Sequence, residues 1–315
     1  MFEAAFRQGI RFPVSCENGV CHICQGVLLS GRCLIPTGEV VEAVNKELML
    51  CKAIPVADCE IEINGVLKPG EIALKTFACQ VEAIEELNHD VYRVELRPPA
   101  GKRVEFYAGQ YLSVLMDGRD PSFFSIASVP TQPDEPANRN IELHVQAAEG
   151  WESASAVINF IKTHPVVKVQ LPYGKACLAE KIDQPLLLIA AGTGFAQMQS
   201  IIEQALSVNP EQEISLYWGG RQSDDIYLAK KPEEWKQTYK NFSYRTVSGE
   251  TDDNEWQGHH EQLFNTVLQD GHDLKACQVF SSGSPGMVYA TMDALLDNGM
   301  PKENFHSDVL EYAPR

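Results

Sequence analysis

The stretch Cys16-Glu-Asn-Gly-Val-Cys21-His-Ile-Cys24 places three cysteines in the spacing C-x4-C-x2-C, and Cys51 follows downstream as a fourth. A loop this short brings three thiolates around one metal cluster while its backbone N–H groups face the cluster, which stabilises the negative charge. Gly19 suits the unusual backbone dihedrals that such wrapping requires. The spacing therefore predicts a 2Fe–2S cluster held by Cys16, Cys21, Cys24 and Cys51.

Two other interpretations of these cysteines compete with the cluster. A zinc site is expected to have two C-x2-C pairs, and the chain has one such pair here. The cysteines could also be structural free thiols. Cys33 and Cys59 are spare in this part of the chain, and Cys59 begins the alternating segment Cys-Glu-Ile-Glu-Ile, where it is expected to pack in a strand. We therefore assign Cys51 as the fourth ligand.

Residues 2–66 resemble plant-type ferredoxin domains, through the cysteine motif and through Phe2 to Ile10, which match the helix that precedes it. The resemblance implies a small β-grasp fold. Such domains begin with a β-hairpin that this sequence lacks, so a truncated version of the fold is expected. Glu17 and His22 also stand where the family usually has arginine and a small residue.

Length and composition narrow the remaining possibilities. At 315 residues the chain is long for one hydrophobic core, so two or three domains are expected. Its net charge of −17 argues against a nucleic-acid partner, because phosphate binding needs clusters of basic residues. No apolar run approaches the roughly 20 residues of a membrane helix, and the first residues do not resemble a secretory signal. We expect a cytoplasmic protein without membrane contact, whose cysteines are reduced thiols or metal ligands.

Beyond the cysteine motif, the residue pattern changes twice. Gly65 to Lys75 contains Pro69 and Gly70 and is predicted to be a linker. After it, short alternating runs of β-branched and aromatic residues predict an antiparallel barrel or sandwich, interrupted by one helix from Ser153 to Lys162. The strands are expected at residues 91–97, 110–116, 123–129, 141–145 and 166–171.

From Pro185 onward, apolar strands alternate with helical periodicity. A continuous apolar run at Leu186 to Ala190 precedes helical spacing at Phe195 to Leu206, and further strands are expected near 214–218, 242–247 and 277–280. This alternation predicts a parallel, doubly wound α/β sheet. The fold class is therefore multidomain, α+β and α/β, with expected domains at residues 1–66, 76–180 and 183–315.

The segment from Phe106 to Val129 contains Gly109-Gln-Tyr and, after a turn, Ser122-Phe-Phe-Ser-Ile-Ala-Ser. It resembles the flavin-binding barrel of the ferredoxin–NADP reductase superfamily, whose signature is Arg-x-Tyr/Phe-Ser followed by small residues. The resemblance implies that Phe124 flanks the flavin ring and that Ser125 hydrogen-bonds near its reactive nitrogen, as the catalytic side chain. Two phenylalanines on a strand could also be core packing, but the order of motifs along the chain favours flavin. The implied contacts to FAD or FMN are Phe124, Ser125, Ile126 and Ser128.

The same segment departs from the superfamily pattern at Ser122, where an arginine normally binds the flavin phosphate. Arg119 lies three residues away and could substitute only if the turn folds back. Gly150-Trp-Glu-Ser is at best a weak match to a pyrophosphate-binding loop. We therefore expect the flavin to be held loosely.

The segment Ala191-Gly-Thr-Gly-Phe-Ala follows an apolar strand and opens a predicted helix. Its glycines let the backbone approach a diphosphate while the helix N-terminus faces the negative charge, although Gln197 replaces the usual small residue or proline. Together with Tyr217-Trp-Gly-Gly-Arg and Ser282-Gly-Ser-Pro-Gly-Met, it resembles the NAD(P) domain of the same superfamily. The implied NAD(P)H contacts are Gly192, Thr193, Gly194, Arg221, Gly283, Pro285 and Met287. Ser282 stands where many relatives have cysteine, and Leu310 or Tyr312 takes the place of the terminal aromatic that covers the flavin.

The domain order resembles the reductases of ring-hydroxylating oxygenases and of deoxysugar synthesis, and the last two domains alone resemble bacterial NAD(P)H–flavin reductases. The resemblance implies an NAD(P)H-dependent oxidoreductase. Hydride would pass to a flavin, and single electrons would then pass through the cluster to a one-electron acceptor protein such as an oxygenase. Two alternatives stay open: a reductase that releases reduced free flavin, and a catalytically silent protein that only senses NAD(P)H.

Overall fold

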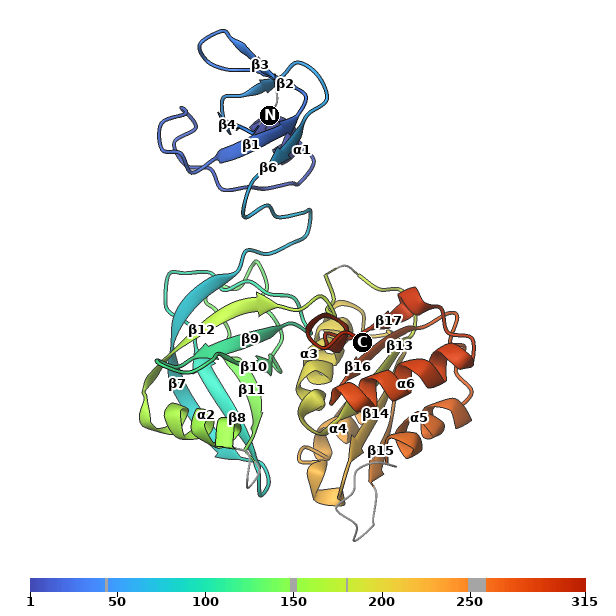
Figure 1. The fold of residues 1–315 in the computed structure, drawn as a ribbon. Coiled ribbons are helices and arrows are strands. Elements are labelled where there is room, and N and C mark those ends of the chain that lie inside the picture. The colour runs from blue at the N-terminus through green and yellow to red at the C-terminus, as the bar shows by residue number, and fades with distance from the viewer. Residues whose placement is uncertain (43–44, 148–151, 180, 249–258) are drawn as a thin grey trace. The chain divides into compact units, whose positions relative to one another are not determined.

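The computed structural model describes residues 1–42, 45–147, 152–179, 181–248 and 259–315. The chain forms two compact units, Met1–Ala73 and Leu74–Arg315 (Figure 1). The boundary falls inside the predicted linker, where no named helix or strand lies between Glu62 and Lys75. Within the residues described above, no helix combines the length and the hydrophobicity that a membrane span requires.

The first unit consists of a short helix, α1 (Phe2–Arg7), and short antiparallel strands around a small core. One sheet has the order β4–β1–β6 and the other the order β3–β2–β5. Cys24, Leu28 and Leu50 are among its fully buried residues, so the end of the cysteine loop is anchored in the core. The strands are β1 (Gln25–Ser30), β2 (Arg32–Leu34), β3 (Val40–Glu42), β4 (Lys46–Met49), β5 (Ile54–Pro55) and β6 (Glu60–Glu62).

The second unit begins with a six-stranded antiparallel sheet in the order β10–β9–β12–β7–β8–β11. An antiparallel bridge between Ile126 and Leu143 joins the two edge strands and closes the sheet into a barrel. The inward residues of these strands form one core, against which helix α2 (Glu152–Thr163) packs Val157 and Ile161. The strands are β7 (Lys75–Glu86), β8 (Val91–Arg97), β9 (Tyr111–Leu115), β10 (Ser122–Ser125), β11 (Ile141–Gln146) and β12 (Val166–Tyr173).

The strands predicted for this barrel all form, within a few residues at their ends, but strand β7 was not predicted. It pairs with β12 on one side and β8 on the other, so it is central to the sheet. Of its residues, only Phe77 and Cys79 are buried. The alternation of Phe77, Cys79 and Val81 is short, and a register shift between Val81 and Ala83 ends it halfway along the strand.

The rest of the unit is a parallel five-stranded sheet in the order β15–β14–β13–β16–β17, as the alternation of strand and helix predicts. Helices α3 and α4 cover one face and α5 and α6 the other (Figure 1). The strands are β13 (Leu186–Ala191), β14 (Ile214–Gly220), β15 (Phe242–Ser248), β16 (Gln278–Ser282) and β17 (Phe305–His306). The helices are α3 (Phe195–Val208), α4 (Lys230–Thr238), α5 (His259–Gln269), α6 (Pro285–Asp297) and α7 (Val309–Tyr312).

This strand order determines where a ligand can bind. From β13 the chain runs outward to β14 and β15 and then crosses to β16 on the other side of β13. In open α/β sheets such a switch point leaves a crevice at the carboxyl ends of the two strands. The segments at that point are Gly192–Gly194, which follows β13, and Ser282–Ser284, at the end of β16.

Candidate functional site

The cysteine loop of the first unit is held in an unusual backbone conformation. Glu17, Gly19 and His22 all have positive φ angles, of 51°, 84° and 59°. Residues other than glycine rarely adopt such backbone angles, and those that do cluster at functional sites. The two residues that depart from the ferredoxin pattern, Glu17 and His22, are therefore two of the points where the loop turns.

This backbone directs N–H groups toward the cysteine sulfurs. The N–H of Cys21 lies 3.4 Å from Sγ of Cys16. Backbone hydrogen bonds, from Asn18 first and also from Val20 and Cys21, lower the pKa of the half-buried Cys16 thiol to about 6, and contact with the Cys21 side chain contributes as well. An N–H donor beside a sulfur stabilises the thiolate, which is the form that binds iron.

The four predicted ligands lie as two pairs. Cys16 contacts Cys21, and Cys51 contacts Cys24. Burial raises the pKa of Cys51, contact with Cys24 raises it further, and the N–H of Gly19 acts in the opposite direction. Among the described residues, no three His, Cys, Asp or Glu side chains are grouped closely enough to hold a single metal ion. Two thiol pairs fit a cluster of two irons, each of which takes two thiolates.

Cys33 and Cys59 form a separate contact. Their sulfurs lie 3.5 Å apart, and Cys59 also donates to the carbonyl oxygens of Arg32 and Ala57. Burial raises the pKa of Cys33 to about 11. Cys33 and Cys59 thus contact each other, whereas Cys51 contacts Cys24 of the cysteine loop, and this geometry supports Cys51 over these two as the fourth ligand.

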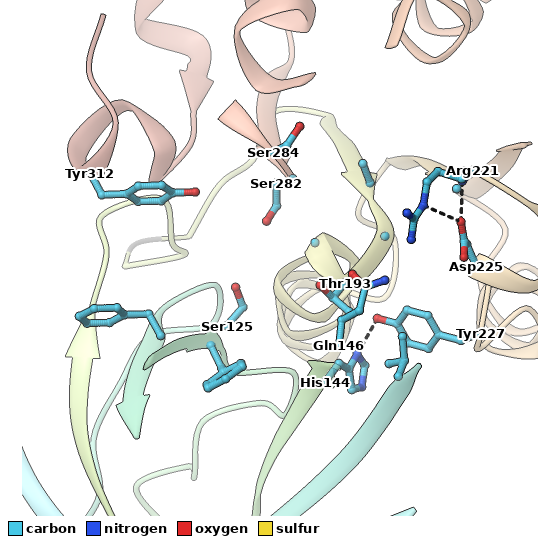
Figure 2. Close-up of a pocket in the computed structure, with 18 residues that line it drawn as sticks. Ser125, His144, Gln146, Thr193, Arg221, Asp225, Tyr227, Ser282, Ser284 and Tyr312 are labelled. Atoms are coloured by element: carbon cyan, nitrogen blue, oxygen red, sulfur yellow. Dashed lines mark hydrogen bonds and ion pairs between the residues drawn. The ribbon is translucent and has the colours of Figure 1, made fainter. Parts of the chain in front are cut away.

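In the second unit, a cavity of about 390 Å³ opens at the switch point of the parallel sheet, between that sheet and the barrel (Figure 2). The barrel contributes the ends of β10 and β11, and the parallel sheet contributes the segments after β13, β14 and β16. Eight predicted site residues come together in its lining: Phe124, Ser125, Gly192, Thr193, Gly194, Arg221, Gly283 and Tyr312.

Two of these glycines are required by close backbone contact. A Cβ atom on Gly194 would lie 2.2 Å from the carbonyl oxygen of Ser282, and one on Gly283 would lie 2.4 Å from Cε of Met287. The turn after β13 and the end of β16 therefore approach each other more closely than any side chain allows. The exposed backbone between them is available to a diphosphate.

The other four predicted cofactor contacts do not line this cavity. Ile126 is buried in the barrel core, and the Ser128 hydroxyl accepts a hydrogen bond from the N–H of Glu142. Pro285 is the first residue of α6, whose N-cap is Ser284. Met287 is fully buried beneath Gly283. The structure thus places all four where they support residues that line the cavity.

An adjoining cavity of about 440 Å³ is bordered by aromatic side chains, including Tyr111, Phe123, Phe124 and Tyr312. Phe123 is 55% exposed and meets Tyr111 edge-on, with ring centroids 5.8 Å apart. Phe124 packs partly against the barrel core, whereas the adjacent Phe123 points to the opposite face of the strand. An open aromatic surface beside Ser125 is suited to hold a planar ring system.

The residues expected at the flavin phosphate lie on the β9–β10 hairpin. Ser122 is half-buried at the start of β10 and pairs with Val114, and Arg119 is exposed in the turn before it. Of the weakly matching segment 150–153, residues 150 and 151 and the side chains of 152 and 153 lie outside the described part of the chain.

Several lining residues were not predicted from the sequence, among them His144, Gln146, Asp225 and Tyr227. Asp225 accepts hydrogen bonds from the N–H groups of Arg221 and Gln222, and its Oδ2 lies 3.7 Å from Nε of Arg221. The sequence signal was weak, because His144 shares the polar face of β11 with Glu142 and Gln146, although the structure buries it. Its polar partners are Glu142 on the same strand and Tyr227 in the α/β part of the unit.

Comparison with known proteins agrees with this architecture. Residues 1–56 match the family of 2Fe-2S iron-sulfur cluster binding domains, and residues 188–293 match the family of oxidoreductase NAD-binding domains. The NAD(P)H-flavin reductase of Vibrio harveyi is 31% identical over 75% of this chain and 99% of its own length. The chain belongs to the ferredoxin–NADP reductase superfamily. It is a reductase with an iron–sulfur domain, and the prediction of an NAD(P)H-dependent flavin and iron–sulfur oxidoreductase is confirmed.

Two further similarities extend over the whole reductase. Reductase component 1 of terephthalate 1,2-dioxygenase from Comamonas is 28% identical over 100% of this chain and 93% of its own length. The crystal structure of an Amycolatopsis cytochrome P450 reductase matches with a TM-score of 0.66 and 24% identity. The match covers 98% of the present chain and 92% of the Amycolatopsis chain. The structural match supports the same order of folds.

Proposed function

We propose that the reductase takes hydride from NAD(P)H in the 390 Å³ cavity and delivers single electrons to an oxygenase-type partner protein. The observation that carries the proposal is the convergence of Ser125, the Gly192–Gly194 turn and Gly283 on one cavity. These are the groups that the sequence assigned separately to the flavin and to the nicotinamide dinucleotide. Because these groups line one cavity, they support a site in which the flavin ring and the nicotinamide ring lie next to each other.

The residues of this site would bind and orient the two cofactors. Ser125 offers a hydroxyl at the end of β10, and Gly192–Gly194 offers backbone next to the start of α3. Arg221 is the one Lys or Arg side chain among the cavity-lining residues that the structure describes. Tyr312, at the carboxyl end of α7, borders both cavities and is placed to exclude water from a ring held against Phe124.

A bound flavin accepts an electron pair as hydride and releases electrons one at a time, and a 2Fe–2S cluster carries single electrons. The chain supplies the sulfur ligands of Cys16, Cys21, Cys24 and Cys51 and the N–H groups that stabilise their negative charge. We propose these four cysteines as the cluster ligands and domain limits of 1–66, 76–180 and 183–315. A cytoplasmic location is proposed as well, because ligand thiols of this kind need a reducing compartment.

A second candidate function is the reduction of free flavin, which then leaves as product. It is supported by Ser122, which offers a neutral hydroxyl where the superfamily has an arginine. The Vibrio relative, a flavin reductase by name, matches 75% of this chain over 99% of its own length.

One experiment separates the two candidates. Purified protein, loaded with iron, sulfide and FAD, is mixed anaerobically with NADH or NADPH while absorbance is followed at the flavin and cluster wavelengths. The proposed function predicts that the cluster is reduced after the flavin within one protein molecule. Flavin reduction without cluster reduction, at any excess of NAD(P)H, would support the free-flavin candidate instead.

A further inference from the structure

The two ends of the 390 Å³ cavity have different linings. Ser125 and Tyr312 also border the adjoining aromatic cavity, which is suited to a planar ring. Among the residues that the structure describes, none from β14 or the turn after it borders that second cavity. In the view of Figure 2, Ser125 and Tyr312 lie on one side of the pocket and Arg221 and Asp225 on the other, with Thr193 between them.

This arrangement orients a dinucleotide. Strand β13 lies between β14 and β16 in the sheet, so the turn Gly192–Gly194, where the backbone is open to a diphosphate, is central. A nicotinamide that reaches the flavin ring has to lie toward Ser125 and Tyr312. Because the diphosphate joins the two nucleosides, the adenosine half then extends the other way, toward the end of β14. The charged side chains of the lining at that end are Arg221 and Asp225.

Asp225 is fixed in position by the turn to which it belongs. Its Oδ2 accepts hydrogen bonds from the N–H groups of Arg221 and Gln222, over 2.7 and 3.1 Å. The barrel supports the same turn, because Asn88, between β7 and β8, donates a hydrogen bond to the carbonyl oxygen of Asp224 over 2.8 Å. The carboxylate therefore cannot move away from a ligand without breaking these contacts.

The second oxygen of Asp225 is available to a ligand. Oδ1 has no hydrogen-bond partner among the described residues, although the side chain is only 10% exposed and lines the cavity. A carboxylate oxygen accepts hydrogen bonds and donates none. It suits a ribose hydroxyl, which can donate, and it repels a phosphate group, which carries up to about two negative charges at neutral pH.

The neighbouring cations do not compensate for this repulsion. Nε of Arg221 lies 3.7 Å from Oδ2 of Asp225, so the two charges largely cancel for an approaching phosphate. Lys231 on α4 and Arg245 on β15 form ion pairs of 2.7 Å with other carboxylates and do not line the cavity. Among the described residues, this end of the cavity therefore combines an acceptor for a hydroxyl with no unpaired counter-charge for a phosphate.

We propose that Asp225 accepts a hydrogen bond from the 2′-hydroxyl of the adenosine ribose, and that this contact makes the reductase specific for NADH. NADPH carries its additional phosphate on that same ribose oxygen, so it loses the hydrogen bond and meets the carboxylate. The inference rests on the proposed function, because it assumes that the dinucleotide occupies this cavity. Asn88 acts as a positioning residue, through which the barrel holds the turn of the α/β part.

The test compares the parent with Asp225→Asn, in which the amide oxygen can keep the N–H contacts of the turn while the NH2 group replaces Oδ1. Asp225→Ser is a second variant, which removes the charge and keeps a short acceptor. Asp224→Asn is the matched control, because it changes the same charge on the adjacent, exposed residue, which does not line the cavity. Oxidation of NADH and NADPH is measured with ferricyanide, and calorimetry measures binding of ADP-ribose and of its 2′-phosphorylated form.

The parent should prefer NADH over NADPH in kcat/KM by at least about tenfold, and should bind ADP-ribose more tightly than the 2′-phosphorylated form by a similar factor. In Asp225→Asn, kcat/KM should rise about tenfold for NADPH and fall about threefold for NADH, through KM and with kcat within about twofold. Asp225→Ser should change the preference in the same direction. Asp224→Asn should leave it within about twofold of the parent.

A parent that uses both nucleotides equally, or prefers NADPH, would overturn the inference and leave the proposed function intact. An unchanged preference in folded, flavin-loaded Asp225→Asn or Asp225→Ser would also overturn it. If Asp224→Asn changes the preference as much as Asp225→Asn does, net charge and not contact with Asp225 selects the nucleotide. A parent protein that binds neither form of ADP-ribose and oxidises neither nucleotide would instead contradict the proposed function.

Discussion

The side-chain amide of Gln197 donates a hydrogen bond to Oδ2 of Asp308 over 3.2 Å, inside the second unit. The same amide nitrogen donates to the carbonyl oxygens of Gly109 and Ala176. Oδ1 of Asp308 in turn accepts from the N–H groups of Lys175 and Ala176. Gln197, which departs from the superfamily pattern at the start of α3, thus ties the barrel, helix α3 and the segment before α7 together.

This contact makes the stability of the second unit depend on pH. Burial raises the pKa of Asp308 to about 6 from an ordinary value of 3.8. The unfolded chain loses this proton first as pH rises, so the contribution of Asp308 to stability is full below about pH 4 and is lost as pH approaches about 6. A shift of this size corresponds to roughly 2 to 3 kcal/mol.

Asp308→Asn should remove this dependence and lower stability at pH 4, because the NH2 group that takes the place of Oδ2 cannot accept from Gln197. Urea unfolding is followed by tryptophan fluorescence, because all four tryptophans belong to the second unit. The free-energy difference between parent and variant should shrink from pH 4 to pH 7. The exposed Asp183, changed to Asn, is the control and should show a constant difference. If the difference in the free energy of unfolding between the parent and Asp308→Asn stayed constant from pH 4 to pH 7, the pKa of Asp308 would not be raised.

The assignment of the cluster ligands predicts opposite results at two cysteines. Cys51→Ser should abolish the visible absorbance of the cluster, because it removes one thiol of the pair with Cys24. Cys59→Ser should keep it, since Cys59 contacts Cys33 and not a ligand. Iron and sulfide analysis of reconstituted protein should give two of each per parent chain. Unchanged absorbance in Cys51→Ser would require another fourth ligand.

Loss of the cluster should leave NAD(P)H oxidation intact and impair the reduction of a one-electron protein acceptor. Cluster-free Cys51→Ser is expected to oxidise NAD(P)H with ferricyanide or free flavin at a rate within about threefold of the parent, because hydride transfer uses only the second unit. Reduction of a one-electron protein acceptor, such as cytochrome c, should fall at least about tenfold. If the folded, flavin-loaded variant were inactive with every acceptor, the proposed order of electron transfer would be wrong.

The side chain at Ser122 predicts how tightly flavin is held. A charge-assisted hydrogen bond to phosphate contributes about 1.5 to 3 kcal/mol, so Ser122→Arg should tighten FMN and FAD binding by roughly tenfold to a hundredfold. Riboflavin has no phosphate, and its Kd should not change. Fluorescence quenching with the three ligands measures the effect. Equal tightening of riboflavin would place phosphate recognition elsewhere, and Arg119, in the preceding turn, would be tested next.

The elements that could be predicted from sequence are those whose signal is local. Leu186–Ala191 is apolar throughout because β13 is covered on both faces, and the glycine turn follows it directly. Strand β7 was missed because pairing with β8 and β12, and not burial of its own side chains, holds most of it in the sheet. His144 and Tyr227 are 83 residues apart and meet only once the barrel packs on the parallel sheet. Such long-range contacts leave no periodicity in the sequence.

The segment between the two units has a kinetic consequence. Hydrogen bonds between Arg11 and Leu67 tie the linker to the iron–sulfur unit, and the chain up to Ala73 belongs to that compact unit. Because one chain carries both units, neither can diffuse away from the other. Electron exchange between them is therefore a first-order process, and diluting the enzyme will not slow it.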